Sequence, residues 1–191
     1  MFVGGVPAII NRISFTGELG YEIYVAPHYQ LKLYEELMEA GKEFNIKPFG
    51  GRALMSMRLE KNWGAWTLDY RPDFTAKETG LDAFINWDKE FIGKESAQKQ
   101  NSSNKLIPLI VETNDIDVTN KEAGMNGDQS IGYVTSGGFA HFVNKSVAFT
   151  FVDQKKINSE NKIQVEINGD LFNCSIIKEP LYDPSGQKMR S

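Results

Sequence analysis

The hydrophobic pattern of this 191-residue chain changes its period at one place, the polar run Gln98–Asn104. Before this run, apolar residues recur at three- and four-residue steps, as they do in amphipathic helices. After it, they gather in short segments with strand composition. A polar run of this kind is typical of a linker between domains. We therefore predict two domains, residues 1–100 and residues 105–191.

The second domain is predicted to contain only strands. Segments with strand composition lie at residues 106–112, 131–135, 145–152, 162–167 and 171–178. Turn-forming pairs separate them, among them Asn126–Gly127, Gly137–Gly138 and Asn168–Gly169. Five or six short strands at this spacing indicate an antiparallel barrel or sandwich.

The first domain mixes helices with strands, which makes the chain α+β. Residues 28–44 predict an amphipathic helix whose apolar side, with Leu31 and Tyr34, should cover a sheet. Further elements are expected at residues 52–61 (helix), 83–87 (strand) and 94–99 (helix).

The stretch Ser14–Val25 predicts a hairpin with two glycines in its turn. Side chains alternate along a strand, so Glu22 and Tyr24 share one face and the hydrophobic residues beside them take the other. A carboxylate can accept two parallel hydrogen bonds from an N–C–N edge, such as that of an aminopyrimidine, while aromatic rings stack on the ligand. On these residues alone, the face is either a ligand wall or the solvated side of a hairpin.

Charge and composition restrict the partners. The net charge is −4, and acidic and basic residues are interspersed, so we expect neither nucleic acid nor an anionic membrane as a partner. No segment reaches the roughly 18 consecutive apolar residues of a membrane span. The single cysteine, Cys174, lies in a core-like alternation with Phe172 and Ile176, and it rules out a disulfide within one chain. We expect a soluble cytoplasmic protein.

Standard catalytic motifs are missing from the sequence. There is no Walker loop, no dinucleotide-binding glycine fingerprint, no paired Cys-x-x-Cys and no His-Glu-x-x-His, so no metal site is predicted. Two histidines and one cysteine supply a nucleophile and its base poorly. The catalytic residues stay unknown at this point.

Several other residues have two interpretations. Arg58 and Glu60 cannot face each other on a helix, so each needs a partner elsewhere, and we interpret both as structural. Trp63 and Trp66 either form the floor of a pocket for a planar ligand or pack into a small separate core beneath the loop. His141 either points into a cleft between the domains or is solvated.

A set of motifs occurs in one order along nearly the whole chain. They are Arg12–Tyr24, Met57–Lys61 with Trp66, Glu78–Leu81, Phe91–Lys94, Val134–Gly138, Lys145–Ser146 and Glu179–Leu181. Together they resemble the folate-dependent aminomethyltransferase family, which includes the glycine-cleavage T-protein and the folate domains of dimethylglycine and sarcosine dehydrogenases. The sequences Gly-Glu-Leu-Gly-Tyr-Glu and Arg-Leu-Glu-Lys resemble the motifs of the dehydrogenases more closely than those of the glycine-cleavage proteins.

The resemblance implies a partial ferredoxin-like folate-binding domain followed by a small antiparallel β-barrel. It implies transfer of a one-carbon unit from an amine of the glycine, sarcosine or dimethylglycine type to tetrahydrofolate. By position, Glu22 would hold the aminopyrimidine edge of the pterin, with Ile23 and Tyr24 packed beside it. Phe15 stands where the dehydrogenases have a folate-contacting tyrosine, which keeps the ring and loses the hydroxyl.

The departures from the family bear on activity. Leu54 stands where glycine-cleavage relatives have a folate-contacting arginine, and Arg52 lies on another side of the helix, so that role is not transferred. The family's catalytic aspartate lies in an N-terminal half without a counterpart here, and the chain carries no flavin fingerprint. The expected partners are folate, a flavoprotein or a chain carrying that half, and a second copy of this chain. The alternative is a non-catalytic folate-binding or interaction module that needs a partner chain.

Overall fold

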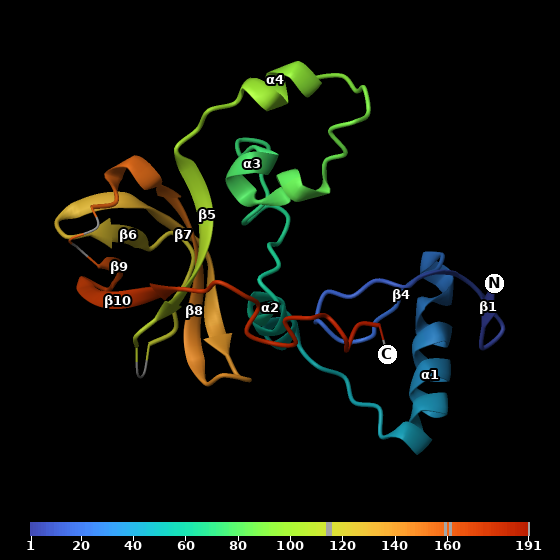
Figure 1. Cartoon of the computed structure of the whole chain (residues 1–191). Helices are drawn as coiled ribbons and strands as arrows, with labels where there is room; N and C mark the ends of the chain where they lie inside the picture. The colour runs from blue at the N-terminus through green and yellow to red at the C-terminus, as the bar shows by residue number, and fades with distance from the viewer. Residues whose placement is uncertain (114–115, 159, 161, 191) are drawn as a thin grey trace.

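The computed structural model describes residues 1–113, 116–158, 160 and 162–190. Helix α2 (Gly51–Glu60) lies between a β-barrel on one side and the N-terminal elements on the other (Figure 1). Within the described residues, no helix is long and apolar enough to cross a membrane.

Six antiparallel strands close the barrel in the order β10-β5-β8-β7-β6-β9. Their bounds are β5 Asn104–Val111, β6 Ala123–Asn126, β7 Gln129–Ala140, β8 Lys145–Asp153, β9 Ile163–Ile167 and β10 Asp170–Ile176. A core made mostly of valine, isoleucine and leucine side chains is buried among them, including Leu109, Val134 and Val152, each with no exposed surface. The predicted α+β class and antiparallel barrel are confirmed.

Two predicted turns of the barrel have different outcomes. Asn168 and Gly169 both have positive φ, 53° and 91°, and they connect β9 to β10 as the hairpin prediction requires. The predicted break at Gly137–Gly138 is wrong, because β7 runs through it. A Cβ on Gly137 would lie 2.4 Å from the carbonyl oxygen of Val118, so this glycine permits a close backbone approach rather than a turn.

The N-terminal region holds short strands and helices. They are β1 Phe2–Val3, β2 Val6–Pro7, β3 Ile9–Asn11, β4 Glu22–Tyr24, a 3-10 turn Pro27–Tyr29, α1 Gln30–Ala40, a 3-10 turn Gly41–Phe44, α2, α3 Ala76–Thr79, a 3-10 turn Leu81–Phe84 and α4 Lys94–Lys99. The three predicted helices are confirmed. The predicted strand at residues 83–87 is wrong: Gly80, at φ 75°, turns the chain from α3 directly into a 3-10 turn.

The predicted packing side of α1 is also wrong. Leu33 is buried at 7% exposure, whereas Leu31 and Tyr34 are 69% and 53% exposed. The neighbouring sheet, β3 with β4, has only three residues in each strand, so it can cover only one side of the helix. Helix α1 therefore carries apolar residues on two sides and leaves one of them open.

Helix α2 packs on the outside of the barrel. Leu59 is 1% exposed and joins Ala140, Val147, Phe149 and Ile177 in a second apolar cluster. Neither of the two core clusters takes a residue from 1–58. The apolar core of the described chain thus lies in the barrel and at its contact with α2.

A buried carboxylate fixes this contact. Asp69, which is fully buried, pairs with Arg58 of α2 at 2.7 Å and accepts the backbone N–H of Ala65 at 2.8 Å. It also accepts the hydroxyls of Thr135 and Ser136 in β7, at 2.5 and 2.9 Å. The loop after α2 is thereby joined to both the helix and the barrel. These contacts give Arg58 a structural partner.

The barrel also holds the single cysteine. Cys174 is half-buried, contacts the barrel core, and donates to the carbonyl of Phe172 at 3.5 Å. Burial raises the pKa of its thiol to about 12. The expected alternation is wrong at Ile176, which is 53% exposed, because it lies at the end of β10.

Replacing the buried carboxylate should destabilise the protein strongly. Asp69→Ala leaves Arg58 as a buried cation without its counter-charge, and we expect a loss of about 3–5 kcal/mol in the free energy of unfolding, measured by urea denaturation. The matched control is Asp73→Ala, which breaks a half-exposed pair with Arg71 and should cost less than about 1 kcal/mol. Similar losses for both variants would contradict the role of Asp69.

Candidate functional site

The hairpin of β3 and β4 presents the predicted site residues. Its register pairs Ile9 with Tyr24 and Asn11 with Glu22, and these four side chains share one exposed face. The predicted alternation of Glu22 and Tyr24 against their neighbours is confirmed. Ile9 and Asn11 were not singled out from the sequence, and only the cross-strand register could have found them.

Glu22 and Tyr24 contact each other on this face. The hydroxyl of Tyr24 donates a hydrogen bond to the carboxylate of Glu22. This hydrogen bond and the negative charge of Glu22 raise the pKa of Tyr24 above its usual value. The pair therefore combines a carboxylate acceptor with a neutral aromatic ring at neutral pH.

The ring of Tyr24 borders a shallow hollow of about 530 Å³. The hollow is otherwise lined by apolar or aliphatic residues, namely Met1, Phe2, Pro7, Ala8, Ile9, Val25 and Ala26. An apolar recess beside a few polar groups is the arrangement that small-ligand sites use. Glu22 is linked to this hollow through its hydrogen bond with Tyr24.

The other predicted contacts lie apart from this pair. Ile23 pairs with Ile10 on the opposite face of the sheet, where both are half-buried. Phe15 is half-buried in the loop between the two strands. The structure thus brings Glu22 and Tyr24 together and places Ile23 and Phe15 elsewhere in the hairpin.

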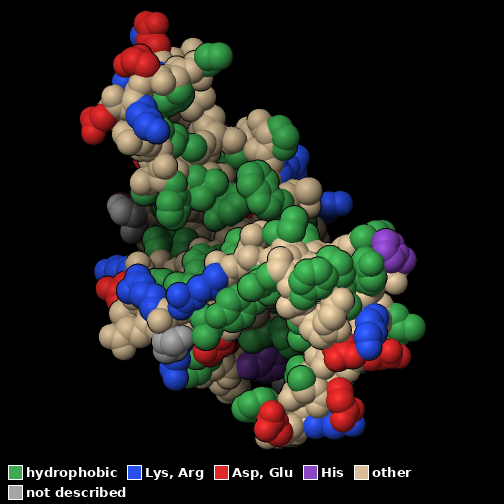
Figure 2. All heavy atoms as spheres, turned by 90° about the vertical axis from the view of Figure 1, so that its right-hand side faces the viewer, with side chains coloured by type: hydrophobic (Ala, Val, Ile, Leu, Met, Phe, Trp, Pro, Cys, Tyr) green, Lys and Arg blue, Asp and Glu red, His purple; other side chains and the backbone are tan. Residues whose placement is uncertain are grey.

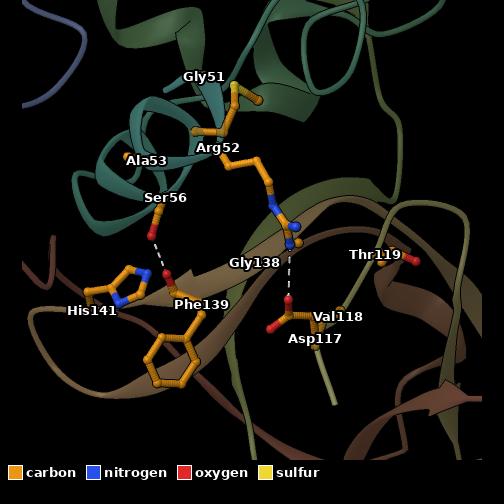
Figure 3. A pocket seen from close by; sticks show the side chains of 12 residues that line it. Gly51, Arg52, Ala53, Ser56, Asp117, Val118, Thr119, Gly138, Phe139 and His141 are labelled. Carbon is orange, nitrogen blue, oxygen red and sulfur yellow. Dashed lines mark hydrogen bonds and ion pairs between the residues drawn. The ribbon is translucent and has the colours of Figure 1, made fainter. Parts of the chain in front are cut away.

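A larger cavity of about 600 Å³ lies between α2 and the barrel (Figure 3). His141 lines it and is also exposed, so each of the two interpretations of this residue holds in part. Across it, Arg52 pairs with Asp117 at 3.3 Å, and Ser56 donates to the carbonyl of Phe139. Because the charges of Arg52 and Asp117 offset each other, this cavity is a weaker candidate for a charged ligand than the Glu22 face.

The tryptophan loop fits neither interpretation fully. Trp66 is 78% exposed and packs edge-to-face on Tyr70, with ring centroids 6.0 Å apart. The hydroxyl of Tyr70 accepts the backbone N–H of Gly64 at 3.1 Å. Trp66 is thus too exposed for a small separate core, and Tyr70 is the ring that anchors the loop.

Family comparisons match both parts of the chain in order. The model described as the GCVT N-terminal domain matches residues 1–89, and the model described as the glycine cleavage T-protein C-terminal barrel domain matches residues 104–183. The chain belongs to the glycine-cleavage T-protein family. The resemblance predicted from the motifs is confirmed.

Curated relatives agree with this assignment to the T-protein family, and a solved structure has a similar fold. Mitochondrial dimethylglycine dehydrogenase of Mus musculus is 34% identical over 184 residues, which are 94% of this chain and 21% of that protein. Aminomethyltransferase of Thermoanaerobacter sp. (strain X514) is 30% identical over 190 residues, 97% of this chain and 51% of that protein. Glycine cleavage system aminomethyltransferase T from Bartonella henselae has a similar fold, with a TM-score of 0.78 and 24% identity, covering 92% of this chain and 50% of that chain. The chain spans about half the length of the aminomethyltransferases and about a fifth of the dehydrogenase.

The contact between Glu22 and Tyr24 predicts a shifted tyrosine titration. Glu22→Ala removes both the acceptor and the negative charge that raise the pKa of Tyr24, so this tyrosine should ionise at lower pH in the variant. The pH dependence of tyrosinate absorbance measures this shift, in a titration curve to which all seven tyrosines contribute. Glu35→Ala on α1 is the control and should leave the curve unchanged. Superimposable curves for wild type and Glu22→Ala would contradict the contact.

Proposed function

We propose that this chain carries the tetrahydrofolate-contacting part of an aminomethyltransferase-type protein. The reaction would move a one-carbon unit from an amine of the glycine, sarcosine or dimethylglycine type onto a nitrogen of tetrahydrofolate. The observation that supports this most is the Glu22–Tyr24 pair beside an apolar hollow, in a chain of the T-protein family. In this proposal, residues 1–100 form the folate part and residues 105–191 the barrel domain.

The chemistry of the face suits a pterin. The aminopyrimidine ring offers an N–C–N donor edge, and a carboxylate such as Glu22 can accept two parallel hydrogen bonds from it. The ring of Tyr24 and the side chain of Ile9 supply apolar contact for the rest of the bicycle. Ile23 lies on the opposite face of the sheet and Phe15 in the loop between the two strands, and their contacts with folate stay predictions from the motif.

A partner polypeptide is part of the proposal. By resemblance, the family's catalytic aspartate belongs to the half of the aminomethyltransferases that this chain does not span. Figure 2 looks onto the α1 side of the molecule and shows hydrophobic side chains gathered across this face. Leu31 and Tyr34 of α1 are exposed. The β3–β4 sheet has only two strands, and such a sheet is marginally stable by itself. We infer that a polypeptide with the remaining half of the folate domain covers α1.

The open side of α1 also favours a second candidate function. A chain that binds folate or a partner without catalysing transfer would use the same surface for association. Oxidation of the amine, where the donor requires it, would fall to a flavoprotein. The cytoplasmic location stays a prediction, and the dehydrogenase relative is named as mitochondrial.

Removing the carboxylate of Glu22 should weaken folate binding. Glu22→Ala loses a charged bidentate contact worth about 2–3 kcal/mol, so the dissociation constant for tetrahydrofolate should rise roughly 30- to 150-fold in calorimetric titration. Glu35→Ala, an exposed glutamate of α1, is the matched control. The assignment of Glu22 as a folate contact would be wrong if the wild type does not bind at millimolar folate, or if Glu22→Ala binds equally well.

The open side of α1 predicts association with the complementary half. We expect a one-to-one complex in sedimentation velocity when this chain is mixed with the part of the Thermoanaerobacter aminomethyltransferase that it does not span. Leu31→Asp should weaken the complex by placing a charge in an apolar contact, whereas Leu171→Asp, at an exposed position on the barrel, should not. A homodimer that Leu31→Asp disrupts would assign this side to a second copy instead.

A further inference from the structure

Lys61 follows the last turn of α2 and is almost fully buried, at 3% exposure. Its ammonium donates to the carbonyl of Asp183 at 2.6 Å and lies 3.5 Å from the carboxylate of the same residue. The rings of Trp63 and Tyr182 are 5.7 and 5.9 Å away. A buried lysine is rare unless it is paired, and this one is paired with a residue 122 positions along the chain.

The stem of Lys61 supports the turn of the β3–β4 hairpin. A Cβ on Gly17 would lie 2.5 Å from Cδ and 2.6 Å from Cγ of Lys61. Gly17 has φ 89°, and its N–H donates to the hydroxyl of Ser14 at 3.0 Å. The hairpin turn therefore rests directly on the methylene groups of the lysine, and only glycine leaves room for them.

The C-terminal segment, residues 182–189, binds the same hairpin from a second direction (Figure 1). The N–H of Tyr182 donates to the carbonyl of Glu60 at 3.0 Å, and its hydroxyl donates to the carboxylate of Glu18. Arg12 donates to the carbonyl of Met189 at 3.2 Å. Residues from the end of α2, the C-terminal segment and the hairpin thus meet around Lys61.

This meeting point lies next to the candidate ligand face in the sequence. Glu22 follows Glu18 by four residues, on the strand that leaves the hairpin turn. The ladder of β3 with β4 contains only three residue pairs, too few to orient the hairpin by itself. The direction in which Glu22 and Tyr24 point depends on what holds the turn.

We propose that Lys61 and the C-terminal segment form a clamp that positions the Glu22–Tyr24 face relative to α2 and the barrel. The identity of the ligand that binds this face rests on the proposed function, whereas the effect of the clamp on the hairpin does not. Lys61 and Tyr182 are positioning residues, because they act on the ligand through the hairpin.

At neutral pH, the carboxylate of Asp183 is charged and the phenol of Tyr182 is protonated. Burial opposes ionisation of Asp183, but hydrogen bonds from the N–H groups of Lys188 and Gln187, together with the ammonium of Lys61, lower its pKa on balance. The hydrogen bond to Glu18, with burial, raises the pKa of Tyr182 to about 12, so its phenol keeps the proton that it donates. The carboxylate of Asp183 stays charged until the pH falls through its lowered pKa.

Two variants and one control test the clamp. Lys61→Met keeps the length of the stem and removes the ammonium, and Tyr182→Phe removes only the hydroxyl. Each should speed hydrogen exchange of the amides of residues 14–24 about tenfold and weaken tetrahydrofolate binding by about tenfold, while exchange in the barrel strands stays unchanged. Lys99→Met, which breaks an exposed pair with Glu95, should change neither.

A glycine pair tests the contact with the stem. Gly17→Ala and Gly93→Ala place a Cβ at nearly the same φ, 89° and 88°, but only the first meets a side chain within 4 Å. Gly17→Ala should therefore loosen the hairpin more than Gly93→Ala loosens its own surroundings, and the excess should vanish in a Lys61→Ala background. An effect of Gly17→Ala that is the same with and without Lys61 would overturn the contact.

The exchange measurement separates this inference from the proposed function. Faster hairpin exchange in Lys61→Met, in a protein that binds no tetrahydrofolate, would leave the clamp standing and remove the folate assignment. Unchanged hairpin exchange would overturn the clamp whatever the ligand. Faster exchange throughout the barrel would overturn it too, since it would mark a general loss of stability instead of a local one.

Discussion

The contact between α2 and the barrel depends on the carboxylate of Asp69. It lies in a loop, yet it is fully buried and bonded to α2 through Arg58 and to β7 through Thr135 and Ser136. A buried carboxylate loses its hydration, and the opposite charge and the N–H and O–H donors around it replace that loss. Together with the apolar cluster around Leu59, this site joins α2 to the barrel.

The two parts of the chain differ in how they are stabilised. Apolar burial holds the barrel together, since the core side chains of its strands fill the interior. The N-terminal hairpin and α1 contain few buried apolar residues. The hairpin turn contacts the methylene groups of Lys61 at Gly17, and hydrogen bonds of Glu18 and Arg12 join the hairpin to the C-terminal segment. The hairpin that carries Glu22 is therefore held by a few specific contacts and not by an extended apolar core.

Local patterns in the sequence predicted most of the elements. Helical periodicity identified α1, and the Asn168–Gly169 pair identified a hairpin turn, because these signals depend on neighbouring residues. Helices were also expected where α2 and α4 lie. The prediction of a turn at Gly137 was wrong because this glycine permits the close approach of the Val118 carbonyl, a long-range contact that no local pattern reveals. The prediction of the packing side of α1 was wrong because the helix has apolar residues on two sides, and the sequence does not show which side is buried.

The candidate site was predictable in part. Alternation placed Glu22 and Tyr24 on one face, and the motif resemblance supplied the chemistry for them. Ile9 joined them only through the strand register, and Ile23 fell on the opposite face by the same alternation. The contacts of Lys61 with Gly17 and Asp183 span 44 and 122 positions, distances over which sequence spacing carries no information.

The state of Cys174 has a practical consequence. With a thiol pKa of about 12, almost none of it is thiolate at neutral pH, and the thiolate is the form that reacts with alkylating reagents. The natural sequence behaves nearly as a cysteine-free background. A cysteine introduced on the exposed hairpin would be the reactive thiol of the molecule, so a single fluorescent or spin label can report the hairpin's motion without any change to the barrel.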